Sequence, residues 1–381
     1  MSEFVSIRHC DDYGPENLAC AVRSALDDIG GLAAFVKPGD RVLLKPNLLM
    51  SAEPEKAMVT HPSFVEVVAR MVIDLGAKPH IGDSPPFGNL PRVLAKSGYE
   101  PFMKRLGVES VPFKTKVCVE FTNGRLFHKM DLAREIFEFD VVVNLPKLKT
   151  HAQMLLTLAV KNLFGAVIGS DKAAWHLRAG RDNLTFATVL AQIYEKVNPK
   201  VSLIDGILAM DEDGPNAGRP RPVGIVGASA DGVALDAVIC RLVGFPVRDM
   251  PTCVVAAKLG LGVADEQRIE VRGDALTGFP LTDFRPPRSV SLTWNMSTRN
   301  PLRRLAKNQL VTRPDIDRTV CQRCGICRDH CPPTAIAELN GSMVIDRSKC
   351  ISCFCCHELC PHGAIRIVEP LMGRLLSSIT R

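Results

Sequence analysis

The chain has 381 residues, 46% of them hydrophobic and 23% charged, and a net charge of +6. This length corresponds to two or three domains, and the composition is that of a folded globular protein, which excludes a disordered or fibrous chain. The mild charge suits an anionic small molecule or an acidic partner and does not indicate nucleic-acid binding. No stretch reaches about 18 uninterrupted apolar residues, and residues 1–14 lack the pattern of a secretory signal. We therefore expect no transmembrane segment and a cytoplasmic location.

Strand and helix patterns alternate along the first three quarters of the chain. The predicted strands are residues 41–47, 78–84, 139–146, 201–206 and 222–229, and the predicted helices are residues 62–76 and 231–244, the second with Asp231 as its N-cap. Residues 117–128 predict a β-hairpin, because Asn123-Gly124 favours a type I′ turn. This order predicts an α/β domain with a mostly parallel, doubly wound sheet and one antiparallel addition.

Polar side chains follow these predicted strands at the point where each strand ends. They are Lys45, Asn47, Asp83, Asn144, Lys147, Lys149, His151 and Asp205. In open α/β sheets the carboxyl ends of the strands form the ligand crevice. Each residue alone has an alternative role as a loop polar group or helix cap, but their shared position predicts a common site.

The segment NLPKLKTH, residues 144–151, concentrates basic side chains. Proline favours extended backbone before it, and in an extended chain Lys147, Lys149 and His151 point the same way. Two ammonium groups on one face repel unless an anion or carboxylates lie between them. The segment therefore predicts an anion site, with an ordinary basic surface edge as the alternative.

Residues 152–169 are apolar on almost all sides and predict a buried helix, which Lys161 and Asn162 interrupt. A buried ammonium is costly unless it is paired, and its pKa is often lowered. Lys161 is therefore a candidate functional lysine, with Asp83, Asp205 or Asp236 as its partner. The alternative is that the Lys161 side chain extends to the surface.

A set of motifs extends from residue 45 to residue 238. In order, they are KPNLL, THP, GDSP, NLPKLKTH, VKNLFG, KAAWH, DGILAMDEDGPNAGRP and ALDAV. The set resembles the prokaryotic family called domain of unknown function 362, often joined to a ferredoxin module. The resemblance covers residues 1–270 and, for the ferredoxin, about 315–368. It implies an α/β domain whose pocket carries the lysine, asparagine and aspartate positions above, beside iron–sulfur clusters. The family commonly has KAEYH at residues 172–176, so a role for a carboxylate at 174 or a phenol at 175 does not carry over to Ala174 and Trp175.

The loop DEDGPNAG, residues 211–218, carries three carboxylates. Its Gly and Pro residues favour a rigid solvated turn, with a divalent-cation site as the alternative. No G-x-G-x-x-G after a strand, Walker A motif or H-E-x-x-H occurs, so classical dinucleotide and ATP sites lack support. A flavin or other organic cofactor stays open.

Residues 284–314 predict a linker between an α/β domain at 1–283 and a small α+β ferredoxin-like domain at 315–368, with a tail at 369–381. Arg303, Arg304 and Lys307 add positive charge to this linker. That charge would attract an acidic redox partner protein or solvate a connecting helix.

Nine of the 14 cysteines fall between residues 321 and 360. Two segments there each contain C-x2-C-x2-C-x3-C-P, and the second repeats the first at an offset of 29 residues. Three thiolates at this spacing wrap one iron–sulfur cube, and the fourth cysteine, before proline, turns away to the other cube. The segment resembles a bacterial two-cluster ferredoxin.

This spacing predicts two 4Fe–4S clusters with crossed ligands. The first has Cys321, Cys324, Cys327 and Cys360 as ligands, and the second has Cys350, Cys353, Cys356 and Cys331. Zinc and a purely structural cluster are the alternatives. The ninth cysteine, Cys355, is either a packed thiol or a spare ligand.

Together these features predict an iron–sulfur oxidoreductase whose clusters pass electrons to or from an anionic substrate or cofactor in the α/β domain. Catalytic roles are expected for Lys149, His151, Lys161 and Asp205, and binding roles for Lys45, Asn47, Asp83, Asn144, Lys147 and Asn162. The alternative is a non-enzymatic electron carrier or scaffold whose α/β domain docks a partner oxidoreductase. Cluster storage or delivery is a third hypothesis. It is less favoured, because delivery needs exchangeable ligands and the set of eight cysteine ligands is complete.

Overall fold

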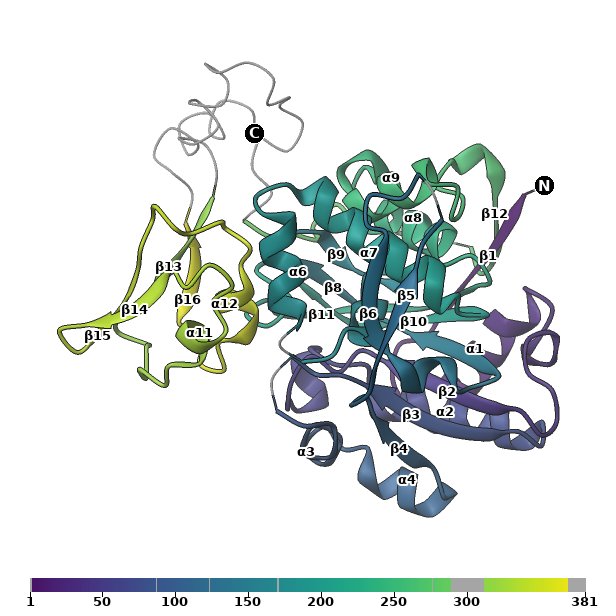
Figure 1. Cartoon of the computed structure of the whole chain (residues 1–381). Coiled ribbons are helices and arrows are strands. Elements are labelled where there is room, and N and C mark those ends of the chain that lie inside the picture. The colour runs from purple at the N-terminus through teal and green to yellow at the C-terminus, as the bar shows by residue number, and fades with distance from the viewer. Residues whose placement is uncertain are drawn as a thin grey trace.

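The computed structural model of the chain describes residues 2–86, 88–122, 124–169, 171–275, 277–288 and 312–368. Figure 1 shows a large α/β domain beside a small module drawn in yellow. Most of the predicted linker, including Arg303, Arg304 and Lys307, and the predicted tail lie outside the described residues. The domain boundaries therefore stay a prediction.

One mixed sheet forms the centre of the α/β domain. Side by side, its strands are β12 (Ile269–Gly273), β1 (Glu3–His9), β11 (Arg219–Ser229), β10 (Val201–Asp211), β7 (Val141–Leu145), β2 (Arg41–Pro46), β3 (Lys78–Asp83) and β4 (Glu109–Pro112). The pairs from β10 to β4 and the pair β1–β12 are parallel, and β11 is antiparallel to both of its neighbours. In addition, β8 (Lys147–His151) pairs parallel with β10 and antiparallel with β9 (Leu155–Thr157). The predicted α/β class with a mostly parallel sheet is confirmed.

Helices cover both faces of this sheet, which makes it doubly wound. In β2, Val42 and Leu44 pack into one core with α1 (Pro15–Asp27) and α2 (Pro62–Asp74). Leu43 between them packs into another core, with α7 (Asn183–Val197) and α9 (Pro251–Lys258). Alternate residues of a strand point to opposite faces, so a strand buried on both sides is apolar throughout.

The remaining helices of the α/β domain are shorter or flank these cores. They are α3 (Leu90–Lys96), α4 (Glu100–Leu106), α5 (Ala159–Asn162), α6 (Asp171–Ala179) and α8 (Gly232–Leu242), with 3-10 turns η1 (Leu32–Ala34), η2 (Pro54–Lys56), η3 (Arg134–Phe137), η4 (Leu163–Ala166), η5 (Val247–Asp249) and η6 (Glu266–Arg268). Asp231 caps α8 as predicted, since its carboxylate accepts from the backbone N–H groups of Val233 and Ala234. Among the described residues, no helix is both long and apolar enough to cross a membrane.

The prediction of one buried helix over residues 152–169 is wrong. The segment forms a turn, the strand β9, and the short helices α5 and η4. Most of it is buried, because Leu155 and Leu156 pack into the core under α8, whereas Val160 and Phe164 pack under α7. An apolar segment sandwiched between two helix layers looks like a buried helix in sequence, since both lack an exposed face.

The predicted hairpin is present as β5 (Lys116–Glu120) paired antiparallel with β6 (Lys129–Ala133). Its second strand starts later than a two-residue turn at Asn123-Gly124 requires. The loop instead closes through the N–H group of Phe121, which donates to the carbonyl oxygen of His128. Asn123 itself lies outside the described residues.

The small module has the twofold internal repeat that its sequence predicts. Strand β13 (Arg313–Ile316) pairs with β16 (Ile365–Val368), strand β14 (Ile336–Leu339) pairs with β15 (Ser342–Ile345), and the helices are α11 (Ile326–Asp329) and α12 (Cys355–Leu359). The sulfur of Cys331 accepts from the N–H group of Ala335, and that of Cys360 accepts from Ala364, both at 3.2 Å. These two equivalent contacts lie 29 residues apart.

The loop at residues 211–218 docks this module onto the α/β domain, so the favoured prediction of a solvated turn is wrong. Asn216 donates to the carbonyl oxygen of Cys360 at 2.7 Å, and the ring of His357 contacts the carbonyl oxygen of Asp213 at 2.9 Å. The carboxylates of Asp211 and Asp213 are buried and paired with arginines, which leaves them poorly suited to a cation.

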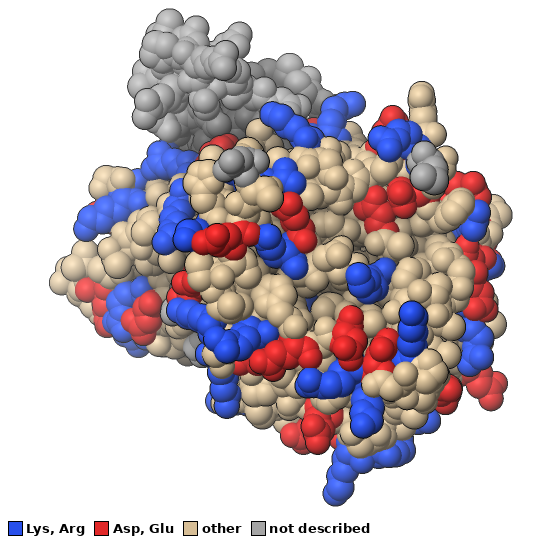
Figure 2. All heavy atoms as spheres, turned by 45° about the vertical axis from the view of Figure 1, so that its right-hand side comes forward, with Lys and Arg blue, Asp and Glu red and all other residues tan. Residues whose placement is uncertain are grey.

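Charged side chains of both signs are interspersed on the face of the molecule that Figure 2 shows. No large region of one sign covers that face. This agrees, for that face, with the thin spread of charge in the sequence.

Candidate functional site

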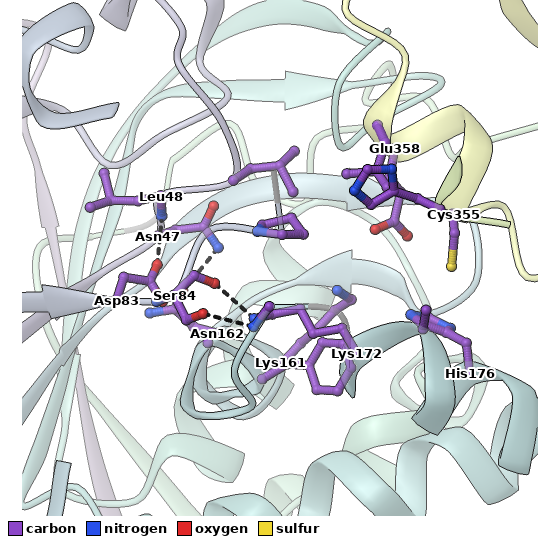
Figure 3. Close-up of a pocket in the computed structure, with 18 residues that line it drawn as sticks. Asn47, Leu48, Asp83, Ser84, Lys161, Asn162, Lys172, His176, Cys355 and Glu358 are labelled. Atoms are coloured by element: carbon purple, nitrogen blue, oxygen red, sulfur yellow. Dashed lines mark hydrogen bonds between the residues drawn. The ribbon is translucent and has the colours of Figure 1, made fainter. Parts of the chain in front are cut away.

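A cavity lies between the α/β domain and α12 of the small module (Figure 3). Its volume, counted as space for the centres of water-sized spheres, is about 90 Å³. The polar residues that line it include Asn47, Asp83, Ser84, Lys161, Asn162, Lys172 and His176 from the α/β domain, and His330, Cys355 and Glu358 from the small module. Four of these, Asn47, Asp83, Lys161 and Asn162, were predicted as site residues.

A buried ion pair lies beneath the cavity, at the ends of β2 and β3. The ammonium of Lys45 is 2.9 Å from Asp83 Oδ1, and Asp83 also accepts from the N–H groups of Leu48 and Ser84. Burial lowers the pKa of Lys45, and Asp83 partly offsets that effect. Gly165 packs directly on the pair, because a Cβ atom there would lie 1.9 Å from Asp83 Oδ1. This close approach leaves no room for a Cβ atom, so the position that ends the VKNLFG motif requires glycine.

Three amide side chains connect the pair to the cavity. Asn162 donates to the carbonyl oxygen of Lys45 at 3.1 Å and to Asn144 Oδ1 at 2.8 Å, so its own Oδ1 faces Asn47 Nδ2, at 2.9 Å. Asn144 in turn donates to the carbonyl oxygen of Ala159. Asn144 and Lys45 therefore support the lining residues rather than line the cavity themselves. The structure brings together these five predicted residues, Asp83 included.

Two lysines supply positive charge to the cavity. Lys161 is half-buried, and no carboxylate of the described residues lies within ion-pair distance of its ammonium, so the predicted partners Asp83, Asp205 and Asp236 are wrong. Asp236 instead accepts from the N–H groups of Ala159 and Val160 at the start of α5. Burial lowers the pKa of Lys161, and Glu358 opposes that shift.

Lys172 and His176 are lining residues that site prediction from sequence missed, although both stand in the KAAWH motif. The ammonium of Lys172 donates to the carbonyl oxygens of Ser84 and Val167, and burial lowers its pKa to about 7. His176 stacks on Phe186, and burial lowers its pKa to about 3, so the ring is neutral. Ala174 is exposed and Trp175 packs against Phe127, so the departure from the family pattern lies outside the cavity lining.

The small module closes the cavity with Glu358 and Cys355. Glu358 Oε1 lies 2.8 Å from Nε2 of His151, without hydrogen-bond geometry. Because Nδ1 of His151 accepts from two backbone N–H groups, the ring proton is on Nε2. Burial lowers the pKa of His151 to about 4. Burial alone would raise the pKa of Glu358, but His151 and Lys161 outweigh it and hold that pKa well below its usual range.

Lys147 and Asp205 form a second buried ion pair, separate from the cavity lining, with their side chains 2.8 Å apart. The hydroxyl of Tyr13 accepts from Lys147 and donates to Asp205, and the Tyr13 ring stacks on His61. Both Tyr13 and His61 were missed, since neither follows a predicted sheet strand.

Lys149 and the segment around it are buried, so the alternative of a basic surface edge is wrong. The ammonium of Lys149 donates to the carbonyl oxygen of Met58 at 2.5 Å and does not line the cavity. Burial, together with Lys161, lowers the pKa of Lys149 well below its ordinary value. Lys147, Lys149 and His151 thus reach three different partners rather than one shared anion.

Two hollows in the small module are each lined by four cysteines. One contains Cys321, Cys324, Cys327 and Cys360, and the other contains Cys331, Cys350, Cys353 and Cys356. Each group takes three cysteines from one repeat and the fourth from the other, and four converging thiols fit a 4Fe–4S cluster.

The fold and these hollows define an iron–sulfur protein with an α/β domain. A 4Fe-4S dicluster domain matches residues 313–361, and the domain of unknown function (DUF362) matches residues 42–241. The chain belongs to the DUF362 family, as its motifs predict.

A thylakoid-associated protein of Synechocystis sp. is 41% identical over 261 residues, which are 68% of this chain and 81% of that protein. Among solved structures, the lactate racemase apoprotein from Thermoanaerobacterium thermosaccharolyticum superposes with a TM-score of 0.41 at 11% identity. The match covers 61% of this chain and 55% of that one, so this chain corresponds to little more than half of the solved protein.

Proposed function

We propose that the chain is an oxidoreductase in which two 4Fe–4S clusters exchange electrons with a small anionic ligand held in the cavity. The observation that carries this proposal is that both domains line the same cavity: Lys161 and Lys172 come from the α/β domain, and Cys355 and Glu358 come from α12. Cys355 is followed directly by Cys356 and lies two residues after Cys353, and both Cys353 and Cys356 line the second cysteine hollow. A ligand in the cavity would thus lie beside one cluster.

The clusters, when bound, would supply one-electron transfer at potentials set by their surroundings. The eight cysteines of the two hollows would hold them. Lys161 and Lys172 would bind the anionic group of the ligand, and Asn47 would orient it. Lys172, whose pKa burial lowers to about 7, would be the residue that moves a proton at neutral pH.

The two hollows differ in exposure, which supports a direction for electron transfer. Cys324 of the first hollow is exposed, whereas Cys353 and Cys356 of the second are buried beside the cavity. An external redox protein would therefore exchange electrons at the Cys324 edge, and the second cluster would exchange them with the ligand. A cytoplasmic location stays a prediction.

The test begins with anaerobic purification, iron and sulfide analysis, and mass spectrometry of any retained small molecule. We expect about eight iron atoms per chain, a retained anion in the wild type, and its loss in Lys161→Gln. The matched control is Lys37→Gln, since Lys37 is exposed and remote from the cavity lining. The retained molecule should then change the oxidation state of the reduced clusters.

A cluster-loaded protein that retains no molecule, and whose clusters react only with protein partners, would contradict the enzyme proposal. That result would favour the electron carrier.

A further inference from the structure

The polar atoms that line the cavity without a partner describe the ligand they would bind. Asn47 Oδ1, Glu358 Oε1 and His176 Nδ1 are buried atoms without a hydrogen-bond partner among the described residues. Buried polar atoms of this kind are rare in folded proteins, because each costs about 1–3 kcal/mol when left unpaired. All three residues line the same cavity.

The orientation of Asn47 follows from a backbone carbonyl and is therefore fixed. The carbonyl oxygen of Lys45 can only accept, so the contact at 3.1 Å identifies Nδ2 of Asn162. Oδ1 of Asn162 then faces Asn47, whose Nδ2 must be the donor at 2.9 Å. The atom of Asn47 left without a partner is consequently an acceptor.

The second acceptor comes from the small module, where Glu358 Oε1 lies 2.8 Å from Nε2 of His151 but without hydrogen-bond geometry. A carboxylate oxygen accepts hydrogen bonds and donates none while it is ionised. Glu358 Oε1 is buried on the α12 side of the cavity, and Asn47 lies on the opposite, β2 side (Figure 3). A ligand that spans these two sides and satisfies them must carry at least one O–H or N–H group of its own.

The same cavity offers donors and positive charge to another part of the ligand. An ammonium group has three donors. Lys172 uses two of them on the carbonyl oxygens of Ser84 and Val167, and Lys161 uses none on the described residues. Lys161 and Lys172 can therefore offer donors and positive charge to a carboxylate group of the ligand.

The size of the cavity limits the ligand further. At about 10–15 Å³ of such space for each water molecule, about 90 Å³ corresponds to roughly six to nine waters. A molecule of about five to eight non-hydrogen atoms fits that space. We propose, on the basis of the proposed function, that the ligand is a small carboxylic acid carrying a hydroxyl or amino group within a few bonds of its carboxylate.

Matched two-carbon probes test this inference by anaerobic titration calorimetry on the full-length, cluster-loaded protein. Glycolate has the carboxylate and a hydroxyl, glycine has the carboxylate and an amino group, acetate has the carboxylate alone, and ethylene glycol has hydroxyls alone. We expect glycolate or glycine to bind at least about tenfold more tightly than acetate, with no binding of ethylene glycol. Which of the two binds distinguishes a hydroxy acid from an amino acid.

Two variants connect that preference with the unpaired acceptors. Glu358→Gln and Asn47→Ala should each reduce the preference for the donor-carrying acid over acetate to about threefold or less. Iron content close to the wild-type value would show that the clusters are intact. If Glu358→Gln lowers the iron content, Asn47→Ala still tests the inference, because Asn47 lies outside the small module.

Acetate binding as tightly as the donor-carrying acids, or failure of all four probes to bind, would overturn the inference. The proposed function is contradicted separately, if a bound acid leaves the oxidation state of the reduced clusters unchanged. If instead a retained anion of another kind oxidises the clusters, the proposed function holds and only the inference about the ligand is wrong.

Discussion

The two parts of this molecule differ in how their sites are built. In the small module each cysteine hollow takes three of its four cysteines from one stretch of seven residues, such as Cys321 to Cys327. In the α/β domain the cavity draws Asn47, Asp83, Lys161 and Lys172 from four separate segments and is closed by a second module. A site built locally is encoded in residue spacing, whereas a site built from distant segments depends on the whole fold.

The largest expected effect tests the crossed pairing of the cysteines. If Cys321 and Cys360 hold the same cluster, the double variant Cys321→Ala/Cys360→Ala should keep about four iron atoms per chain. The double variant Cys321→Ala/Cys331→Ala, with both changes in one repeat, should keep almost none, because it damages both clusters. Anaerobic iron and sulfide analysis measures the difference, and equal iron content in the two double variants would refute the crossed arrangement.

Cys355→Ala is the internal control for that experiment. Cys355 lines the cavity and neither hollow, so the variant should keep about eight iron atoms per chain. Loss of half the iron would instead make Cys355 a ligand.

A second prediction concerns the close packing beneath the cavity. Gly165→Ala places a methyl group 1.9 Å from Asp83 Oδ1 and should separate the Lys45–Asp83 pair. Breaking a buried ion pair costs about 3–5 kcal/mol, so the free energy of unfolding should fall by that order, with loss of ligand binding. Gly180→Ala is the matched control, since Gly180 does not line the cavity, a Cβ there meets no neighbouring atom, and only its positive φ of 64° is strained, at about 1–2 kcal/mol. Denaturant unfolding followed by circular dichroism compares the two, and similar losses would argue against this role of Gly165.

Sequence reasoning predicted the two groups of four cysteines from residue spacing, and it predicted the sheet and part of the cavity from the order of the strands. Lys45 and Asp83 end neighbouring parallel strands, so their meeting follows from strand order once the sheet is predicted. Glu358 could not be found this way, because its approach to His151 depends on how two modules dock. In the sequence, Lys172 appeared only within the KAAWH motif and was not predicted as a site residue. Because residues 152–169 were predicted as one helix, the contact between Asn162 and Lys45 was not predicted either.

A third prediction concerns pH and the charge of the cavity. Burial lowers the pKa of Lys172 to about 7, although Asp83 partly opposes that shift. The side chain is therefore protonated below pH 7, where it attracts an anion, and neutral above it. Anion affinity should be highest below pH 7 and fall about tenfold as the pH rises to 9, because the neutral amine no longer attracts the anion. Lys172→Arg stays charged and should give a flat profile, and an equally steep fall in that variant would assign the titration to another group.

The smallest expected effect separates the two buried ion pairs of the α/β domain. Tyr13→Phe removes a hydroxyl that bonds Lys147, Asp205 and the N–H group of Leu208, but leaves the Lys147–Asp205 contact of 2.8 Å in place. Loss of such hydrogen bonds costs about 1 kcal/mol, so the unfolding midpoint should fall slightly. Ligand affinity and cluster reactivity should not change, because neither Tyr13 nor Asp205 lines the cavity. If Tyr13→Phe instead lowers turnover while stability is kept, Asp205 regains the catalytic role predicted from its strand position, and the reaction extends beyond the cavity described here.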